Sequence, residues 1–228
     1  MKKLFFQSFA VAVFALFSFT SCDLFTIDNP TPEDQTDERI NVVIPEDLLL
    51  KVREFMSIYD GVTPPKIEGT FLISPYVYVY TSDGIFEAGD ELDPYVMKFY
   101  NQDMTKNTLD YNGRHLTLDA YQSGEGVFIS GSGNNFTIYF NTEGQSNGIY
   151  LKTALIVSGT MTPEGIKDLK RAFVCIDKGD DPDGALLDVG VYRVFEDGDG
   201  LCEPTEWPAS ARSMRPVVVK NKLIETAK

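Results

Sequence analysis

Short alternations of apolar and polar residues fill most of the chain after residue 65, and they constrain the fold more than any other feature of the sequence. A period of two places successive side chains on opposite faces of a strand, so each alternation predicts a half-buried β-strand. In one such run, Phe136, Ile138 and Phe140 alternate with their neighbours. By this criterion we expect strands at residues 67–73, 76–80, 95–100, 116–120, 127–129, 136–140, 149–160, 171–176 and 186–195.

Turn-forming residues separate these runs. Glycine stands beside other small or polar residues at positions 82–84, 112–113, 131–135, 143–145 and 147–148, as is typical of tight turns between antiparallel strands. The segment 162–170 is ambiguous, because Thr162-Pro163 can begin a short helix whereas Gly165 favours a turn. About eight or nine short strands with close turns predict an all-β fold, either an antiparallel up-and-down barrel or a β-sandwich.

One helix precedes the strands. Between residues 45 and 59, apolar side chains recur at helical spacing, namely Leu48, Leu49, Val52, Phe55, Met56 and Tyr59. Pro45 with two acidic residues after it is a favourable helix start, and Gly61 followed by Pro64-Pro65 ends the pattern. We therefore expect one domain over residues 45–228, in which a short helix leads into the β-strands.

The first 22 residues differ in character from the rest of the chain. Lys2 and Lys3 precede an uncharged apolar run, residues 4–19, whose 16 residues fall short of the ~20 that a membrane span needs. A basic start, an apolar run and small residues are typical of a secretory signal. Phe19-Thr20-Ser21 followed by Cys22 is similar to the lipobox, in a looser form found in lipoproteins of Bacteroidetes.

The resemblance implies that residues 1–21 are removed and that Cys22 is lipidated. The lipid would then anchor the chain to the outer membrane of a bacterial envelope, on its periplasmic or surface face. The alternative is an ordinary cleaved signal in which Cys22 is incidental. Residues 22–44 are acidic and contain Pro30 and Pro32, so we expect a flexible tether that spaces the domain from the membrane.

Charge excludes one class of partner. The mature chain would carry 18 basic and 34 acidic side chains, because the leader contains two lysines and no acidic residue. Such a surface repels the phosphates of nucleic acids and the headgroups of anionic lipids. We therefore expect no nucleic-acid binding, and membrane attachment through the acyl chains alone.

The remaining cysteines allow two interpretations. In an envelope compartment, Cys175 and Cys202 can form a disulfide, because disulfides persist there. Alternatively, Cys175 is a buried free thiol, since it lies in the apolar run 172–176 and a free cysteine packs as a small hydrophobe. Cys202 lies in a polar segment, so the pairing depends on whether the fold brings the two together.

Histidine chemistry is nearly excluded. His115 is the only histidine, so no pair of histidines can hold a metal, and a Ser-His-Asp arrangement would have to use this residue. His115 follows Asn112-Gly113 and is predicted to be a solvated side chain at a turn. We therefore expect a protein that is not an enzyme and that needs no cofactor, with calcium as the one candidate ion.

Two acidic loops are the calcium candidates. Residues 180–184 and 196–200 both cluster carboxylates around glycine, and the candidate ligands are Asp180, Asp181, Asp183, Asp197 and Asp199. Calcium takes several oxygen ligands from a tight loop, although neither loop has the 12-residue EF-hand spacing. The alternative is a pair of polar β-turns that use the conformational freedom of Asp and Gly.

Tyr76, Tyr78 and Tyr80 are the candidate ligand-binding residues. Their spacing of two predicts that they share one face of a strand. On that face they can line a ligand cavity or form a platform on which a sugar stacks, because tyrosine combines a flat apolar ring with a hydroxyl. They can also simply pack against side chains of the neighbouring strands.

A helix followed by Gly69-Thr70-Phe71 and about eight strands resembles the lipocalin and calycin architecture, whose first strand usually carries Gly-x-Trp. Residues 172–201 are also similar to lipocalin-like lipoproteins of Bacteroidetes. The resemblance implies a barrel that holds one small apolar or amphiphilic ligand, although small barrels are sometimes filled by side chains. Our leading hypothesis is thus a lipid-anchored, non-enzymatic ligand-binding protein. The alternative is a surface glycan-binding sandwich, stabilised by calcium.

Overall fold

The computed structural model describes residues 39–146, 148–181 and 183–208. These ranges contain two helices, α1 (Arg39–Val43) and α2 (Glu46–Arg53), and twelve strands. The strands are β1 (Val62–Thr63), β2 (Gly69–Ile73), β3 (Tyr76–Thr81), β4 (Glu91–Leu92), β5 (Tyr95–Asp103), β6 (Thr108–His115), β7 (Ala120–Ser132), β8 (Asn135–Ser146), β9 (Ile149–Thr162), β10 (Gly165–Asp177), β11 (Tyr192–Asp197) and β12 (Leu201–Pro204). The predicted leader, Cys22 and most of the predicted tether lie outside the described residues.

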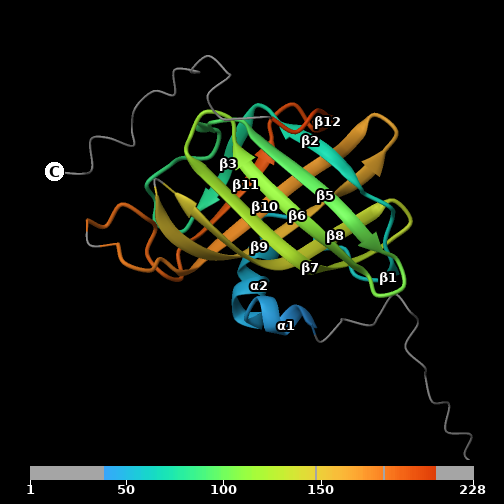
Figure 1. Ribbon diagram of the computed structural model, residues 1–228, viewed down its shortest axis with the longest axis horizontal. Helices are drawn as coiled ribbons and strands as arrows, with labels where there is room; N and C mark the ends of the chain where they lie inside the picture. Colours follow the sequence, from blue (N-terminus) through green and yellow to red (C-terminus); the bar gives the residue numbers. More distant parts are fainter. Residues whose placement is uncertain (1–38, 147, 182, 209–228) are drawn as a thin grey trace, which may run out of the picture.

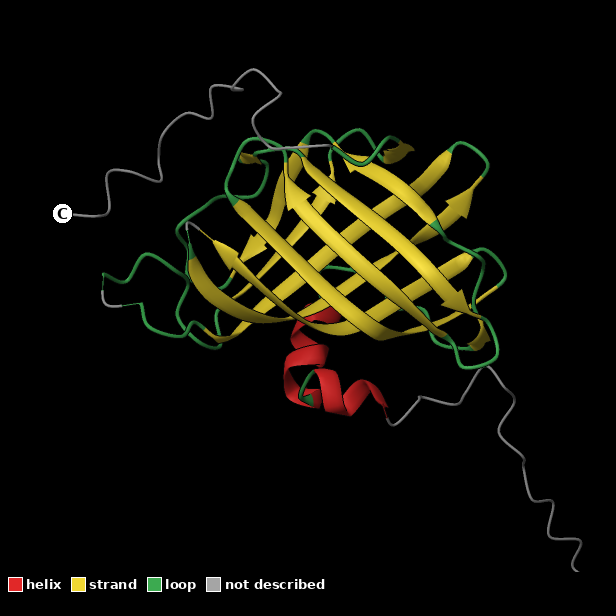
Figure 2. Cartoon of the chain, viewed as in Figure 1, coloured by secondary structure: helices red, strands yellow, loops and turns green. Residues whose placement is uncertain are grey.

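The prediction of an all-β, antiparallel fold is confirmed. Strands β5 to β10 pair in sequence order, each antiparallel to the next, and their ribbons dominate Figure 2. The short strand β1 pairs in parallel with β7. Strand β12 pairs with β2 on one side and with β10 on the other, so the hydrogen bonding is partly ring-like. We call this arrangement the ring.

Several predicted boundaries are wrong. The expected turns at residues 112–113 and 143–145 lie inside β6 and β8, and residues 116–119, expected to begin a strand, connect β6 to β7. The predicted strand 186–195 begins only at Tyr192. In contrast, β9 ends at Thr162 and β10 begins at Gly165, so the turn interpretation of that segment is confirmed.

Asn112-Gly113 is not a turn because Gly113 makes room for two buried tyrosines. A Cβ atom at Gly113 would collide with the hydroxyl groups of Tyr111 and Tyr95, which hydrogen-bond to each other at 3.0 Å. Glycine in a strand interior often marks such a close approach. The residue pair thus carries a packing signal rather than a turn signal.

The inside of the ring is filled by side chains. Its buried apolar residues, which we call the interior cluster, are Ile67, Phe71, Ile73, Tyr76, Tyr78, Tyr95, Met97, Phe99, Leu109, Tyr111, Val127, Ile129, Phe136, Ile138, Phe140, Leu155, Val157, Ile166, Leu169, Phe195 and Cys202. Nine of these are aromatic, and many of their rings touch, as Tyr111 does with Phe140 at 4.5 Å between centroids. The space enclosed by the strands is therefore a packed core, as in small barrels that are filled by side chains.

Both helices pack against the outside of the ring, where Figure 1 places them beneath β7 to β9. Ile40 and Ile44 are buried together with Val52 of α2 in a second apolar cluster on this face. The end of the predicted tether is therefore a helix, and the expected single helix is two, because apolar residues at 40 and 44 find a surface to cover. No helix in the described part of the chain is long and apolar enough to cross a membrane.

Of the two interpretations of the cysteines, the structure has the free thiols, since Cys175 and Cys202 are both buried and not bridged. Cys202 pairs with Ile166 at the start of β10. Because a strand rises about 3.3 Å per residue, Cys175 lies roughly 30 Å further along β10. The Cys202 thiol instead donates a hydrogen bond to the Leu72 carbonyl at 3.0 Å.

Candidate functional site

The three tyrosines of β3 do not share one face, which corrects the sequence-based expectation. Tyr78 and Tyr80 pair with two consecutive residues of β11, so Val79 between them has no partner and forms a β-bulge. Such a bulge reverses the face on which the following side chains lie. Tyr76 and Tyr78 belong to the interior cluster, whereas Tyr80 stacks on Phe55 outside the ring with centroids 4.0 Å apart.

The first acidic loop uses its main carboxylate to close its own turn. Asp181 accepts hydrogen bonds from the backbone N–H groups of Ala185 and Leu186 at 2.8 and 3.1 Å. Although burial opposes ionisation, these bonds lower the pKa of Asp181. Asp180 and Asp183 are exposed to solvent. The polar-turn interpretation therefore accounts for this loop.

The second acidic loop behaves in the same way. Asp197 accepts hydrogen bonds from the backbone N–H groups of Asp199 and Ser74 at 3.3 and 3.4 Å. Burial, and then the hydrogen bond with the Asp199 side chain, raise the pKa of Asp197 to about 7. Within the described ranges, no three His, Cys, Asp or Glu side chains gather into a group that could hold a metal ion.

A buried cation, Arg171, lies inside the ring. Its guanidinium donates to the Tyr76 hydroxyl and to Gln122 Oε1, both at 2.6 Å, and it lies 4.5 Å from the centroid of the Tyr95 ring. Its Nε has no hydrogen-bond partner among the described residues. Its partners among the described residues are neutral hydroxyl, amide and aromatic groups, so dipoles rather than a carboxylate stabilise the positive charge.

His115 belongs to this buried network, which corrects the prediction of a solvated histidine. Its side chain is only 14% exposed, its ring contacts those of Tyr76 and Tyr95, and Nδ1 lies 3.1 Å from the Asp93 carbonyl oxygen. Burial, and then the positive charge of Arg171, lower the pKa of His115 to about 4. The imidazole is therefore neutral near pH 7.

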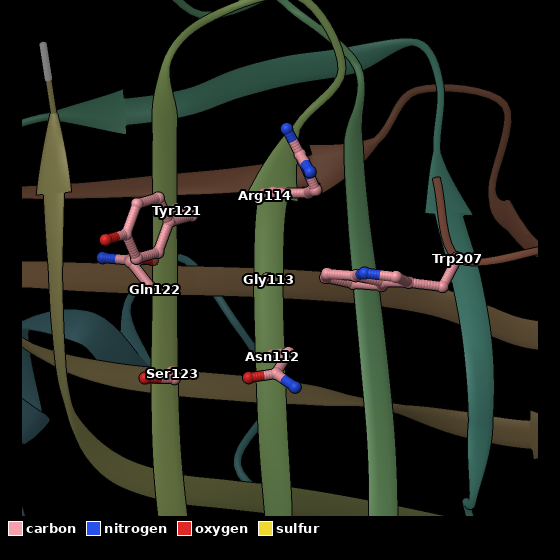
Figure 3. A pocket seen from close by; sticks show the side chains of 7 residues that line it. All are labelled: Asn112, Gly113, Arg114, Tyr121, Gln122, Ser123 and Trp207. Carbon is pink, nitrogen blue, oxygen red and sulfur yellow. The ribbon is translucent and has the colours of Figure 1, made fainter. Parts of the chain in front are cut away.

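A hollow of about 370 Å³ lies on the outer face of β6 and β7. It is lined by Asn112, Gly113, Arg114, Tyr121, Gln122, Ser123 and Trp207. Figure 3 shows the indole of Trp207 and the ring of Tyr121 on opposite sides of Gly113, with Arg114 above and Asn112 below. Tyr121 is 46% exposed, and Trp207 is half-buried. We call this site the Trp207 hollow.

Strand pairing places these side chains together. In the register of β6 with β7, Arg114 lies opposite Tyr121, and Asn112 lies opposite Ser123. Gly113 faces the interior between them, so its two neighbours face outward by the period of two. The floor of the hollow is thus bare backbone, framed by the outward side chains of two adjacent strands.

Trp207 reaches this face because the chain folds back after β12. The backbone N–H of Thr205 donates to the Thr70 carbonyl at 2.8 Å, which holds the segment after β12 alongside β2. Two residues later, Trp207 and Tyr121 lie on opposite sides of the backbone of β6 (Figure 3). The hollow therefore joins one residue near the end of the described chain to residues from its middle.

The hollow presents polar groups around two flat aromatic surfaces. Asn112 Nδ2 donates to the Tyr100 hydroxyl at 3.1 Å, which orients the amide, and Arg114 Nε lies 3.5 Å from the carbonyl oxygen of the next residue. Aromatic faces with a few oriented polar groups are typical of small-molecule and saccharide sites.

The sequence also contains one catalytic motif that sequence reasoning overlooked, but its structural context does not fit the motif. Gly144, Ser146 and Gly148 have the Gly-x-Ser-x-Gly spacing of a nucleophile elbow, which needs a strand followed by a helix. Here Gly148 precedes β9, so a strand is followed by a strand. These residues therefore belong to the hairpin between β8 and β9 and do not form a nucleophile elbow.

Sequence reasoning also missed the residues of the Trp207 hollow. The alternation of outward residues around Gly113 could have identified Asn112 and Arg114, had Asn112-Gly113 not been interpreted as a turn. Trp207 carries no such signal, because its position depends on a contact with β2. No protein-family model, no curated protein and no solved structure matches the chain.

Proposed function

We propose that this protein is a non-enzymatic, lipid-anchored protein of the bacterial cell envelope that binds a saccharide in the Trp207 hollow. The observation that carries the proposal is the pair of aromatic side chains, Trp207 and Tyr121, that lie on either side of a floor of bare backbone (Figure 3). Polar side chains occupy the remaining sides of that floor. The site is therefore open to solvent rather than enclosed.

A sugar ring suits this arrangement. One face of a pyranose presents C–H groups that stack on a flat aromatic ring, while its hydroxyls point outward and need hydrogen-bond partners. Asn112, Arg114 and Ser123 supply such partners around the two rings. A purely apolar ligand would leave these groups without partners, at a cost of about 1–3 kcal/mol for each group that it desolvated.

The packed interior supports this outer site over an apolar ligand inside the ring. The 21 residues of the interior cluster and the Arg171 network occupy the space that such a ligand would need. Removing a side chain to open that space would cost several kcal/mol of stability. The proposed saccharide site needs no such rearrangement.

The anchor proposal rests on the lipobox-like leader and is tested separately. We expect Cys22→Ala to release the protein from the membrane fraction, because the acidic surface offers no electrostatic attachment of its own. The measurement is the distribution of the protein between membrane and soluble fractions after cell lysis in its bacterial host. Unchanged membrane retention of the variant would contradict lipidation at Cys22.

The saccharide proposal is tested by truncating one wall of the hollow. We expect the wild-type protein to bind at least one glycan on a panel of immobilised plant, bacterial and animal polysaccharides. Trp207→Ala should then weaken that binding by about 10- to 100-fold, the usual loss for an aromatic anchor. Calorimetry with the best ligand gives the two dissociation constants.

Tyr150 provides a matched control for this test. It is a tyrosine of the outer face, 43% exposed, whereas Tyr121 in the hollow is 46% exposed. Tyr121→Ala should therefore weaken binding, and Tyr150→Ala should leave it unchanged. Equal effects of the two substitutions, or a Trp207→Ala variant that binds as the wild type does, would place the site elsewhere.

A further inference from the structure

At least six of the 13 lysine and arginine side chains in the described part of the chain pair with a carboxylate. The ion pairs join Arg53 to Asp60, Lys66 to Glu68, Lys106 to Asp103, Lys170 to Glu196, Lys178 to Asp181 and Asp188, and Arg193 to Asp83. Arg114 has no such partner among the described residues, although the chain carries 34 acidic side chains against 20 basic ones. The rim of the hollow thus carries an arginine that no carboxylate of the described residues neutralises.

Arg114 is placed to meet a ligand held between the two rings. It lies opposite Tyr121 in the register of β6 and β7, and Figure 3 shows its side chain rising along the upper rim of the Trp207 hollow. Its single intramolecular bond in the structure, from Nε to a backbone carbonyl, is long at 3.5 Å. The terminal nitrogens of the guanidinium are thus left to make new bonds.

A second cation lies beneath the floor of the hollow. Gln122, which lines the hollow, accepts a hydrogen bond from Arg171 at 2.6 Å on the inner side of the sheet. Arg171 is 3% exposed and is bonded to neutral groups, so its field is poorly screened by water. Arg114 and Arg171 therefore flank the floor of the hollow with positive charge from its two sides.

Positive and negative side chains are interspersed on the outer face around the hollow. By register, Glu143 lies opposite Ser123 on one side and Lys152 on the other, so this acidic residue of the outer face has a lysine as its neighbour. Inside the ring, Asp93 accepts hydrogen bonds from Thr117 and Leu118 and lies beside His115. Lys98, opposite Asn112 in β5, adds a further cation on the outer face.

We infer that the saccharide bound in the Trp207 hollow is acidic and that Arg114 binds its carboxylate. This inference rests on the proposed function and names its substrate class, a polysaccharide that contains uronate sugars. The planar guanidinium presents two parallel N–H donors to a carboxylate, and such bidentate bonds are about twice as strong as neutral ones. The sugar ring stacks on Trp207 and Tyr121 while its carboxylate meets Arg114 at the rim.

The test compares acidic polysaccharides with neutral copies of themselves. The probes are polygalacturonate, alginate and hyaluronan, each alongside a sample in which the uronate carboxyl groups have been chemically reduced to alcohols. Linkage and stacking surface are the same within each pair, and only the carboxylate differs. We expect the full-length protein, solubilised in detergent, to bind at least one acidic form 10-fold or more tightly than its reduced copy.

Two charge-removing variants make the test specific. Arg114→Gln should abolish the preference for the acidic form and leave affinity for the reduced form within about twofold, because stacking on Trp207 is retained. Lys51→Gln removes one positive charge from the exposed side of α2, far from the hollow in sequence and structure. This control should keep the full preference.

The outcomes separate this inference from the proposed function. Equal binding of the acidic and reduced forms, with loss of both in Trp207→Ala, would overturn the role of Arg114 and keep the saccharide site. An equal loss of preference in Lys51→Gln and Arg114→Gln would also overturn it, because general charge attraction would then explain the binding. If the wild type binds none of the wider panel, the proposed function itself fails.

Discussion

Replacing Gly131 by alanine lowers the free energy of unfolding by more than about 3 kcal/mol, whereas the same change at Gly133 costs about 1 kcal/mol. Both glycines lie at the hairpin between β7 and β8, and both have positive φ, +150° and +61°. They differ in their surroundings. A Cβ at Gly131 would collide with the Asn135 carbonyl oxygen and lie 2.9 Å from Phe136 Cα, whereas a Cβ at Gly133 meets nothing within 4 Å.

Gly131 is so sensitive because two other strands approach it closely. It pairs with Phe136 of β8 and with Val62 of β1, and its N–H donates to the Gly61 carbonyl at 3.1 Å. Backbone atoms cannot rotate away as the end of a flexible side chain can, so an added methyl group must separate the strands. The loss therefore contains a packing cost that Gly133→Ala lacks.

Urea denaturation of the two variants and the wild type measures both losses. Gly133→Ala is the matched control, because it introduces the same methyl group at a positive φ in the same hairpin. Equal destabilisation of the two variants would show that backbone conformation, rather than the close approach of β1 and β8, sets the cost at Gly131. A stable Gly131→Ala variant would contradict the pairing of the three strands itself.

Local sequence patterns predicted the fold class because strand alternation and hairpin turns are local properties. The hairpin near Gly131 and the turn between Thr162 and Gly165 are examples, since each has a glycine where the chain reverses. Gly113 shows the limit of the same signal. There the glycine is needed because the hydroxyls of Tyr95 and Tyr111 occupy the space of a Cβ atom, and a tertiary contact of this kind overrides turn propensity.

The candidate site was less predictable than the fold, for physical reasons that differ between residues. The bulge at Val79 separates Tyr80 from Tyr78, and a bulge leaves no mark in a regular spacing of two. The place of Trp207 depends on a bond between Thr205 and Thr70, which are far apart in sequence. The burial of Arg171 inside the ring likewise follows from closure of the sheet rather than from its neighbours in the chain.

Acidification should reveal the buried histidine as a loss of stability. In the unfolded chain, His115 takes up a proton near pH 6.5, whereas in the fold its pKa is lowered to about 4 by burial and by Arg171. Between those pH values the unfolded state holds the additional proton, so stability falls as the pH decreases and stops falling below about 4. The shift corresponds to about 3 kcal/mol in total.

Asp197 acts in the opposite direction over the same pH range. Its pKa is raised to about 7, so between pH 7 and the ordinary range of aspartate the folded state holds the additional proton. Protonation of Asp197 therefore stabilises the fold on acidification, while protonation of the unfolded histidine destabilises it. The wild-type protein reports only the sum of the two effects, and variants are needed to separate them.

His115→Phe removes the titrating imidazole and keeps an aromatic ring against Tyr76 and Tyr95. Between pH 7 and pH 4.5 it should lose about 2–3 kcal/mol less stability than the wild type does. Asp197→Asn should instead lose more than the wild type. Urea denaturation at pH 7 and pH 4.5 measures each of these differences. Each variant is compared with itself at the two pH values, so any destabilisation that does not depend on pH cancels.

A His115→Phe variant with the wild-type pH dependence would mean that the imidazole is not held neutral beside Arg171.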